Sequence, residues 1–425
     1  MTPSPASPQA CHTQTYLHRG SNPATYCPCL NRFERAAQCE ISFKMNPSSK
    51  TIPTEHGGGL RISLVLGIAN WSIFVDHIPN NAISLLTLRN FGFSGATDLF
   101  VFVAGYAAAI IYGGMMLERG FVVATTRIFR RVWQLYAAYI VSFVMYIDVI
   151  GSIAAHLAAP GIIDEYKVIG IVDDPTRTLL HGLMLQSMPL HLDGLQLFIV
   201  LLAIFPLALA AMLHFPGLTL TGSAALYLAA RQFDLYLSAF PEGRWSYNPF
   251  CWQLLFMLGV WSALHGGERL RALREIPILR QLALAYLVFA LATKVAPSTP
   301  QLDGLMPDVL LELLAPISKE TLAPHRLLHF LALAFLFTWL VPHDWRGFRW
   351  KALQPVLKCG EEWLAAFCAG VFLSLAAHVV LITGPNSMAM QAMVSAGGIA
   401  VMAMIAYYVS WSRLQDRRPA LGAEA

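Results

Sequence analysis

The longest runs of residues without a formal charge decide what this chain can fold into. Residues Leu99–Leu117 and Leu195–Leu213 each contain 19 residues and no Asp, Glu, Lys or Arg. As an α-helix, such a run extends for about 28 Å, close to the ~30 Å of a bilayer hydrocarbon core. Hydrophobic residues make up 56% of the 425 residues, against 13% charged. The sequence therefore predicts an integral membrane protein and excludes a soluble enzyme.

Ten apolar segments predict an all-α, polytopic bundle of about ten transmembrane helices. They cover residues 61–78, 97–117, 132–153, 194–213, 217–238, 248–265, 279–296, 326–342, 360–383 and 388–411. Pro and Gly stand at the joints, as at Phe215-Pro216-Gly217, where a helix ends readily. We therefore expect one transmembrane domain over residues 60–412, followed by a short basic tail over residues 413–425.

The first 59 residues differ in composition from the rest. They are rich in Pro, Ser, Thr and Asn, lack a sustained apolar period, and predict a disordered tail. Four of the seven cysteines lie there, at Cys11, Cys27, Cys29 and Cys39. No second Cys or His pair follows at zinc-ribbon spacing, so we predict no metal site. Met45 is an alternative initiator for the chain.

The placement of Lys and Arg predicts the topology. The tail before the first segment and alternate loops after it hold 21 of the 29 positive residues. Such residues stay on the cytoplasmic side, so both termini are expected to be cytoplasmic. The formal net charge of +4 is too small and too scattered to indicate a nucleic-acid partner.

Polar side chains at membrane depth are the first candidates for chemistry, because they are costly to bury in lipid. Several lie at the predicted outer ends of different segments, and we expect them to surround one external pocket. They are Asp76, His77, Asp98, Arg231, Asp234, Asn248, Trp252, Gln253, Arg326 and His329. Arg326 and His329 share a helix face, where they serve either as an anchor or as part of a site.

Other members of this set also have a structural interpretation. Asp76 and His77 precede Pro79 and either end a helix or carry catalysis. Asp98 begins a segment and fits a helix cap as well as a binding site. Arg231 and Asp234 are three residues apart, which favours a pair that neutralises itself on one helix face.

Several longer motifs resemble those of one protein family. The first is FVDHIPNN (residues 74–81), followed by LTLRNFGFSGATDLFVFVAGYAAAIIYG (86–113). The others are RRVWQLYAAYI (130–140), YNPFCWQLLFMLG (247–259), LAPHRLLHFLALAF (322–335) and AFCAGVFLSLAAH (366–378). In these motifs the chain resembles the OpgC family, inner-membrane proteins named for the succinylation of osmoregulated periplasmic glucans. The resemblance runs in order from Leu60 to the C-terminus.

The OpgC family looks related to the acyltransferase-three group, which moves acyl groups from a cytoplasmic donor to extracytoplasmic glycans. The resemblance implies a multi-pass protein of the bacterial inner membrane. It also implies an acyl-CoA or similar thioester as donor substrate, with no bound cofactor. A glycan acceptor, membrane lipid and the glucan-synthesis machinery are the partners it implies. The alternatives are a non-catalytic protein for glycan binding or export, and a transporter.

The first segment of both groups resembles a pattern of Asp, two residues, Arg-Gly, and a His eleven positions after the Arg. His77 and Gly67 match this pattern, whereas Ser63 replaces the Asp and Leu66 the Arg. The resemblance implies His77 as general base, because neutral His accepts a proton at physiological pH. Asp76 is its expected partner.

With Leu66 in place of the Arg, the residue expected to hold the acyl donor is missing. Either Arg127, Arg130 or Arg131 on the cytoplasmic side holds the donor instead, or the chain has no such residue. The expected substrate-binding residues are Arg89, Asp98, Asn248, Lys319, Arg326 and His329. Of these, Arg326 or Lys319 is expected to stabilise an oxyanion or a succinyl carboxylate. The chain also departs from the family pattern at Lys319-Glu320-Thr321 and at Glu362-Trp363.

Overall fold

The structure is a computed structural model that describes residues 56–156, 163, 165–168, 174–295, 318–342 and 344–416. Most of the predicted N-terminal tail, with Met45 and its four cysteines, lies outside the described residues, as do residues 417–425. Within the described residues the regular elements are all helices. The predicted all-α fold is therefore confirmed for this part of the chain.

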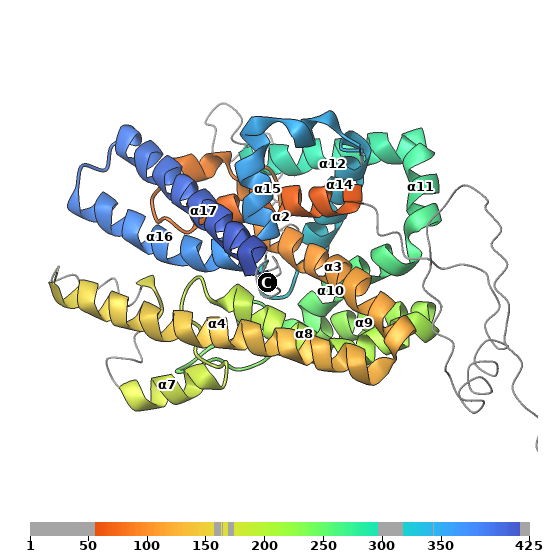
Figure 1. Cartoon of the computed structure of the whole chain (residues 1–425), viewed down its shortest axis with the longest axis horizontal. Coiled ribbons are helices and arrows are strands. Elements are labelled where there is room, and N and C mark those ends of the chain that lie inside the picture. Colours follow the sequence, from red (N-terminus) through yellow and green to blue (C-terminus); the bar gives the residue numbers. More distant parts are fainter. Residues whose placement is uncertain are drawn as a thin grey trace, which may run out of the picture. The chain divides into compact units, whose positions relative to one another are not determined.

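One helix occupies each of the ten predicted segments (Figure 1). These helices are α2 (His56–Asp76), α3 (Ala96–Arg119), α4 (Phe121–His156), α8 (Asp193–His214), α9 (Pro216–Gln232), α10 (Pro249–His265), α12 (Pro277–Val295), α14 (Pro324–Leu340), α16 (Trp363–Thr383) and α17 (Met388–Asp416). The shorter helices are α7 (Pro175–Leu183), α11 (Gly267–Glu275) and α15 (Gln354–Glu361).

Seven of the described helices are long and apolar enough to cross a membrane. The other three of the ten, α9, α10 and α14, have 17 residues each. At 1.5 Å per residue they extend for about 25 Å, a little less than the hydrocarbon thickness. The structure thus supports a multi-pass membrane protein, and the count of ten spans stays a prediction.

Glycine allows α3 and α10 to pack backbone against backbone. A Cβ atom added at Gly105 would overlap the main-chain carbonyl oxygen of Phe256. Reciprocally, a Cβ atom added at Gly259 would overlap the carbonyl oxygen of Phe102. Small residues at such contacts are typical of helix pairs in membranes, where close approach maximises van der Waals contact.

The contact between α2 and α15 is built in the same way. An added Cβ at Gly67 would meet the carbonyl oxygen of Val356, and one at Gly360 would meet that of Ser63. Asn70 strengthens the contact, because its side-chain amide donates to the carbonyl oxygen of Cys359 at 3.3 Å. Residues 63–70, the middle part of α2, therefore form a tight packing surface.

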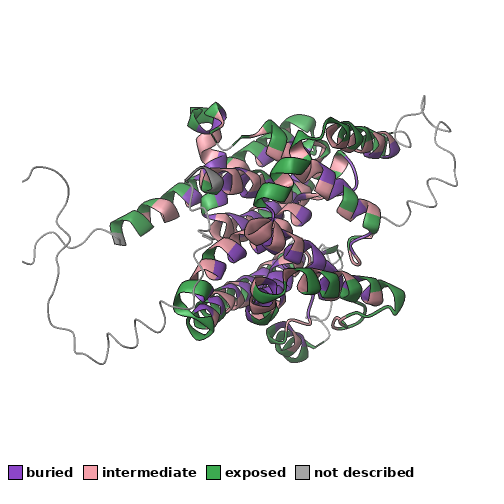
Figure 2. Ribbon diagram, turned by 90° about the vertical axis from the view of Figure 1, so that its right-hand side faces the viewer, coloured by how far each residue is buried: buried purple, intermediate pink, exposed green. Residues whose placement is uncertain are grey.

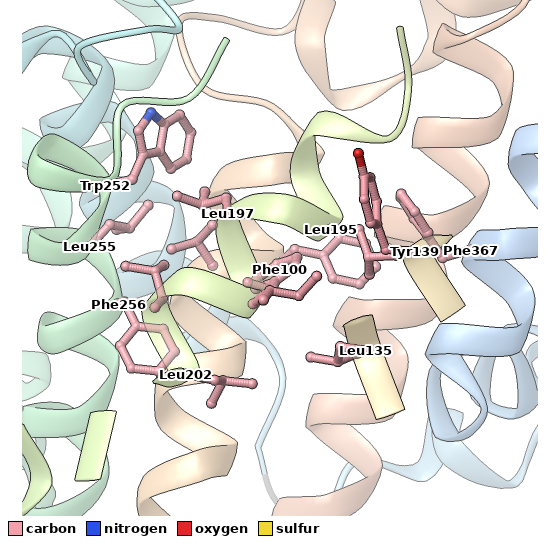
Figure 3. Packing of buried hydrophobic residues seen from close by; sticks show 14 of the residues in the cluster. Phe100, Leu135, Tyr139, Leu195, Leu197, Leu202, Trp252, Leu255, Phe256 and Phe367 are labelled. Carbon is pink, nitrogen blue, oxygen red and sulfur yellow. The ribbon is translucent and has the colours of Figure 1, made fainter. Parts of the chain in front are cut away.

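The main hydrophobic core joins α3, α4, α8, α10 and α16. Figure 3 shows its members Phe100, Leu135, Leu202 and Phe256 meeting between these helices. The burial colours place exposed residues on the outer faces of the helices (Figure 2). Many of these are apolar, as is Leu207 at 69% exposure. Such an exposed apolar surface is what a bilayer would cover.

The helices share two common ends. At one end, which we call the His77 end, α2 ends while α3, α8, α10 and α14 begin. At the other, the Arg61 end, the guanidinium of Arg61 at the start of α2 lies 5.7 Å from the ring centroid of Phe337 near the end of α14. Arg274 also lies there and donates to the carbonyl oxygen of Thr338 at 3.2 Å. Which end faces the cytoplasm stays a prediction.

Candidate functional site

A cavity of about 560 Å³ opens at the His77 end. Its walls come from the end of α2, the loop before α3, the segments that precede α8 and α10, and the start of α14. Five cationic side chains line it, namely Arg89, Lys167, Lys294, Lys319 and Arg326. Two carboxylates, Asp76 and Asp193, line it as well. The cavity is therefore suited to a polar substrate with negative charge.

Two stacked histidines form one wall of this cavity. The ring centroids of His77 and His191 are 3.8 Å apart, and the rings are nearly parallel at 11°. His77 directly follows α2, and its backbone N–H donates to the carbonyl oxygen of Ile73 at 3.0 Å. His191 has a positive φ of 79°, an uncommon conformation for a non-glycine residue that often marks a functional site.

Burial keeps both histidines neutral. Loss of water around the rings lowers the pKa of His77 well below its usual range and lowers that of His191 to about 3. Nδ1 of His77 is buried and has no hydrogen-bond partner among the described residues. Nδ1 of His191 lies 3.3 Å from the hydroxyl oxygen of Tyr146. A neutral ring with an unpartnered nitrogen beside a cavity can accept a proton from a bound ligand.

Asp76 lies beside His77 in the sequence, but its contacts are to the segment that follows. Its carboxylate accepts a hydrogen bond from the Thr87 hydroxyl at 2.5 Å. It also lies 3.7 Å from Nε of Arg89, which is half-exposed at the cavity rim. Asp76 thus positions Arg89 over the cavity.

A buried ion pair joins α3 to α14. Nε and Nη2 of Arg326 donate to the two carboxylate oxygens of Asp98 at 2.9 and 2.6 Å. Asp98 also accepts from the backbone N–H of Gly95 at 2.7 Å and so caps α3, as one of its two interpretations predicted. Arg326 lines the cavity and also lies over the ring of Trp252. The pair therefore has a structural role while Arg326 remains within reach of a ligand.

His329 supports the loop before α3 rather than lining the cavity. Its Nδ1 lies 2.7 Å from the Ser94 hydroxyl oxygen. Its ring also approaches Gly92 so closely that an added Cβ there would overlap it. Gly92 and Ser94 line the cavity, so His329 fixes part of the wall.

Lys319 and Asn248 have different surroundings. Lys319 lines the cavity, and burial together with the nearby charges of Arg326 and Arg89 lowers the pKa of its ammonium group. Asn248 is buried beneath the wall, where it caps α10 and donates to the carbonyl oxygen of Leu235 at 2.5 Å. Its side chain holds the segment that carries Tyr247, which lines the cavity.

The three arginines predicted for donor binding lie in α4, toward the Arg61 end. Arg127 and Arg130 are exposed. Arg131 is partly buried, and its guanidinium lies 5.5 Å from the ring centroid of Trp363 at the start of α16. None of the three arginines lines the cavity at the His77 end.

The predicted pairing of Arg231 with Asp234 is wrong. Helix α9 ends at Gln232, so Asp234 does not continue the helix face of Arg231. Asp234 instead pairs with Arg244, whose Nη2 donates to its carboxylate at 2.7 Å. Arg231 donates to the carbonyl oxygen of Thr321 at 3.1 Å.

The sequence analysis missed five ionisable residues of the cavity wall, namely Lys167, His191, Asp193, Tyr247 and Lys294. The signal for His191 and Asp193 was present, because both immediately precede or begin the apolar run of α8. An ionisable pair at the edge of a predicted span is the same pattern that marked Asp76 and His77. Lys167 and Tyr247 lie in connecting segments, where no helical periodicity predicts how deep a residue lies in the membrane.

A family model described as OpgC protein matches residues 59–414 of this chain. The match includes nearly every described helix and all the described residues of the cavity. The chain therefore belongs to the OpgC family. No curated protein and no solved structure matches the chain.

Proposed function

Since the chain is a member of the OpgC family, we propose that it transfers an acyl group from a cytoplasmic thioester donor, such as an acyl-CoA, to a hydroxyl of a periplasmic glycan. The observation that carries this proposal is the neutral His77–His191 stack in the wall of the charged cavity. In this proposal the protein lies in the bacterial inner membrane. The His77 end faces the periplasm, both termini are cytoplasmic, and ten helices cross the bilayer.

The transfer needs a base, and His77 is the proposed one. Its neutral ring takes the proton from the glycan hydroxyl as the oxygen attacks the thioester carbonyl. The C–O bond forms, the C–S bond breaks, and His77 returns the proton to the departing thiolate. Asp76 contributes by placing Arg89, and Lys319 and Arg326 stabilise the oxyanion or the far carboxylate of a succinyl group.

The charge of the cavity favours an anionic acyl group. Five cations and two carboxylates leave an excess of positive side chains around it. A dicarboxylic acyl group such as succinyl keeps one free carboxylate, which pairs well with arginine or lysine. Asp98, Asn248 and His329 belong to the proposed binding site through the residues that they hold.

The donor has a proposed route on the opposite side of His77. A void of about 30 Å³ lies next to the large cavity, and its lining includes His77, His191 and Trp363. Arg131 lies over the ring of Trp363. Trp363 therefore separates the histidine pair from the arginine, and its displacement would admit a thioester that Arg131 holds by a phosphate. Arg127 and Arg130 attract the donor from the exposed surface of α4.

The first test measures acylation of periplasmic glycans by mass spectrometry in wild-type, deletion and His77→Ala cells. We expect His77→Ala to reach normal membrane levels and to lower acyl transfer roughly 10²- to 10⁴-fold, as loss of a general base does. His214→Ala is the matched control, because His214 is exposed at the Arg61 end of α8. Unchanged glycans in the deletion strain would instead favour a non-catalytic or transport role.

A second test compares two arginines of α4 that lie one turn apart. Arg131→Gln should raise the donor concentration needed for half-maximal transfer, because it removes the cation next to Trp363. Arg127→Gln, at an exposed position, should change this value much less. The measurement is acyl transfer in inverted membrane vesicles over a range of donor concentrations. Equal effects of the two variants would contradict the proposed route.

A further inference from the structure

A second cavity, of about 240 Å³, lies between α2, α3 and α14. It shares no lining residue with the cavity at the His77 end. Phe102 of α3 and Phe330 of α14 approach each other across it, with ring centroids 5.2 Å apart. Ile68, at its edge, is 38% exposed, so the cavity is a groove on the outer face of these helices.

The groove is amphipathic along its length. Nearly all of its wall is apolar, formed by residues such as Val65, Leu99 and Leu333. The polar groups in its lining come from Arg61, Tyr106 and Thr338. Arg61 lies in the second turn of α2 and Thr338 in the last turn of α14, and the charge of Arg61 acts on Tyr106. These groups therefore gather at one mouth of the groove, at the Arg61 end.

A second guanidinium stands at the same mouth. Arg274 donates to the carbonyl oxygen of Thr338 at 3.2 Å, and its charge repels that of Arg61. Of the described residues that line the groove, none is Asp or Glu. Two like charges held close together favour an anion that lies between them.

We infer that this groove binds an anionic glycerophospholipid from the leaflet at the Arg61 end. The phosphate group lies between Arg61 and Arg274, and one acyl chain lies in the apolar part. The volume of the groove, about 240 Å³, exceeds the ~150 Å³ of an apolar cavity that accommodates benzene. The arm of a thioester donor fits poorly, because its amide groups would find few partners along an apolar wall.

The experiment measures lipid binding to the full chain, purified in detergent and freed of lipid. The probes are phosphatidylglycerol, phosphatidylcholine with the same chains, and inorganic phosphate. We expect phosphatidylglycerol to raise the Tm and to remain bound in native mass spectrometry, because a ligand that binds the folded state stabilises it. Phosphatidylcholine and phosphate should each give a much smaller shift. An equal shift from either of them would overturn the inference.

Two matched variants locate the binding. Ala334→Trp fills this groove, whereas Ala283→Trp fills a neighbouring apolar cavity between α12 and α14 whose lining has no Lys or Arg among the described residues. Ala334→Trp should abolish the lipid-dependent rise in Tm and Ala283→Trp should retain it. A folded Ala334→Trp protein with the wild-type rise would overturn the inference.

A charge variant decides the outcome where Ala334→Trp does not fold. Arg61→Gln combined with Arg274→Gln should weaken phosphatidylglycerol binding at least tenfold, since charged hydrogen bonds are lost. The preference over phosphatidylcholine should disappear with it. An unchanged preference would overturn the inference. Neither Arg61 nor Arg274 lines the cavity at the His77 end. A negative result in this lipid-binding experiment therefore leaves the proposed acyl transfer untouched.

Discussion

Two parts of α2 differ in what they contact. Its middle part, residues 63–70, packs so closely on α15 that glycine is required at positions 67 and 360. Its far end, by contrast, opens at Asp76 and His77 onto a cavity of about 560 Å³ with five cations in its wall. The middle part is a packing surface, whereas the far end borders a cavity with seven charged side chains in its wall.

This difference explains the departures from the family pattern. Ser63 and Leu66, which replace the expected Asp and Arg, both lie in the packed middle part of α2 and are buried. Leu66 belongs to the main hydrophobic core. His77, which retains the pattern, lies at the open end. The positions that the resemblance associates with donor binding are therefore packing positions here, whereas His77 lines the cavity.

The largest expected effect comes from breaking the charged region itself. Asp98→Asn leaves the guanidinium of Arg326 buried without its carboxylate, and loss of one partner of a buried pair costs about 3–5 kcal/mol. We therefore expect a large drop in Tm, measured on the purified protein, together with loss of acyl transfer.

Two controls separate this effect from an ordinary surface change. The double variant Asp98→Asn/Arg326→Gln should recover much of the Tm, because no charge remains buried. Asp234→Asn breaks an exposed pair with Arg244 and should change the Tm only slightly, because solvent screens exposed ion pairs. If Asp98→Asn were as mild as Asp234→Asn, the Asp98–Arg326 pair would not be buried as described.

Much of this contrast follows from the sequence, but not all of it. Apolar runs predicted where each of the ten helices lies, because length and hydropathy decide which segments fit a bilayer. Two bounds were wrong: α4 begins at Phe121, eleven residues before the predicted segment 132–153, and α9 ends at Gln232, six residues before residue 238. Polar residues at helix ends predicted that His77, Asp98 and Arg326 lie at one end. The partners of those residues were not predictable, since the Asp98–Arg326 pair joins residues 228 positions apart.

Two further features depend on three-dimensional packing. The stack of His77 on His191 needs the segment before α8 to fold back with a positive φ, which no local pattern specifies. Likewise, a single glycine such as Gly360 gives no sign in the sequence of which backbone it will touch. Spacing along one helix led to the incorrect Arg231–Asp234 pair, because it assumed that α9 continues past Gln232.

The next effect in size tests whether the packed middle part of α2 has lost donor binding. Leu66→Arg with Ser63→Asp restores the family pattern but places charge in the core. A charge at the centre of a membrane helix costs about 2.5–3.5 kcal/mol, and the i,i+3 pairing offsets only part of this. We expect a lower Tm and no gain in glycan acylation over wild type. The restored protein would outperform wild type only if the wild type lacks donor binding, which would favour the non-catalytic alternative.

The smallest expected effect concerns pH, and it tests the open end of α2. Burial lowers the pKa of both His77 and His191, so both rings stay neutral to more acidic pH than an ordinary histidine. A histidine with the usual pKa of about 6.5 would lose roughly half of its neutral form at pH 6.5 and about 90% at pH 5.5. For this protein we expect acyl transfer to change less than about twofold between pH 8 and pH 6.

The measurement is the rate of acyl transfer in vesicles at saturating donor, with the Tm at each pH as a check on folding. The other ionisable groups that line the cavity are Asp76, Arg89, Lys167, Asp193, Tyr247, Lys294, Lys319 and Arg326. If one of these carboxylates must stay ionised, the rate of acyl transfer falls at acidic pH as that carboxylate becomes protonated. The residual activity of His77→Gln would show the same fall. A fall centred near pH 6.5 that His77→Gln removes would instead show that His77 titrates as a solvated histidine. That result would contradict the buried stack and, with it, the contrast between the two parts of α2.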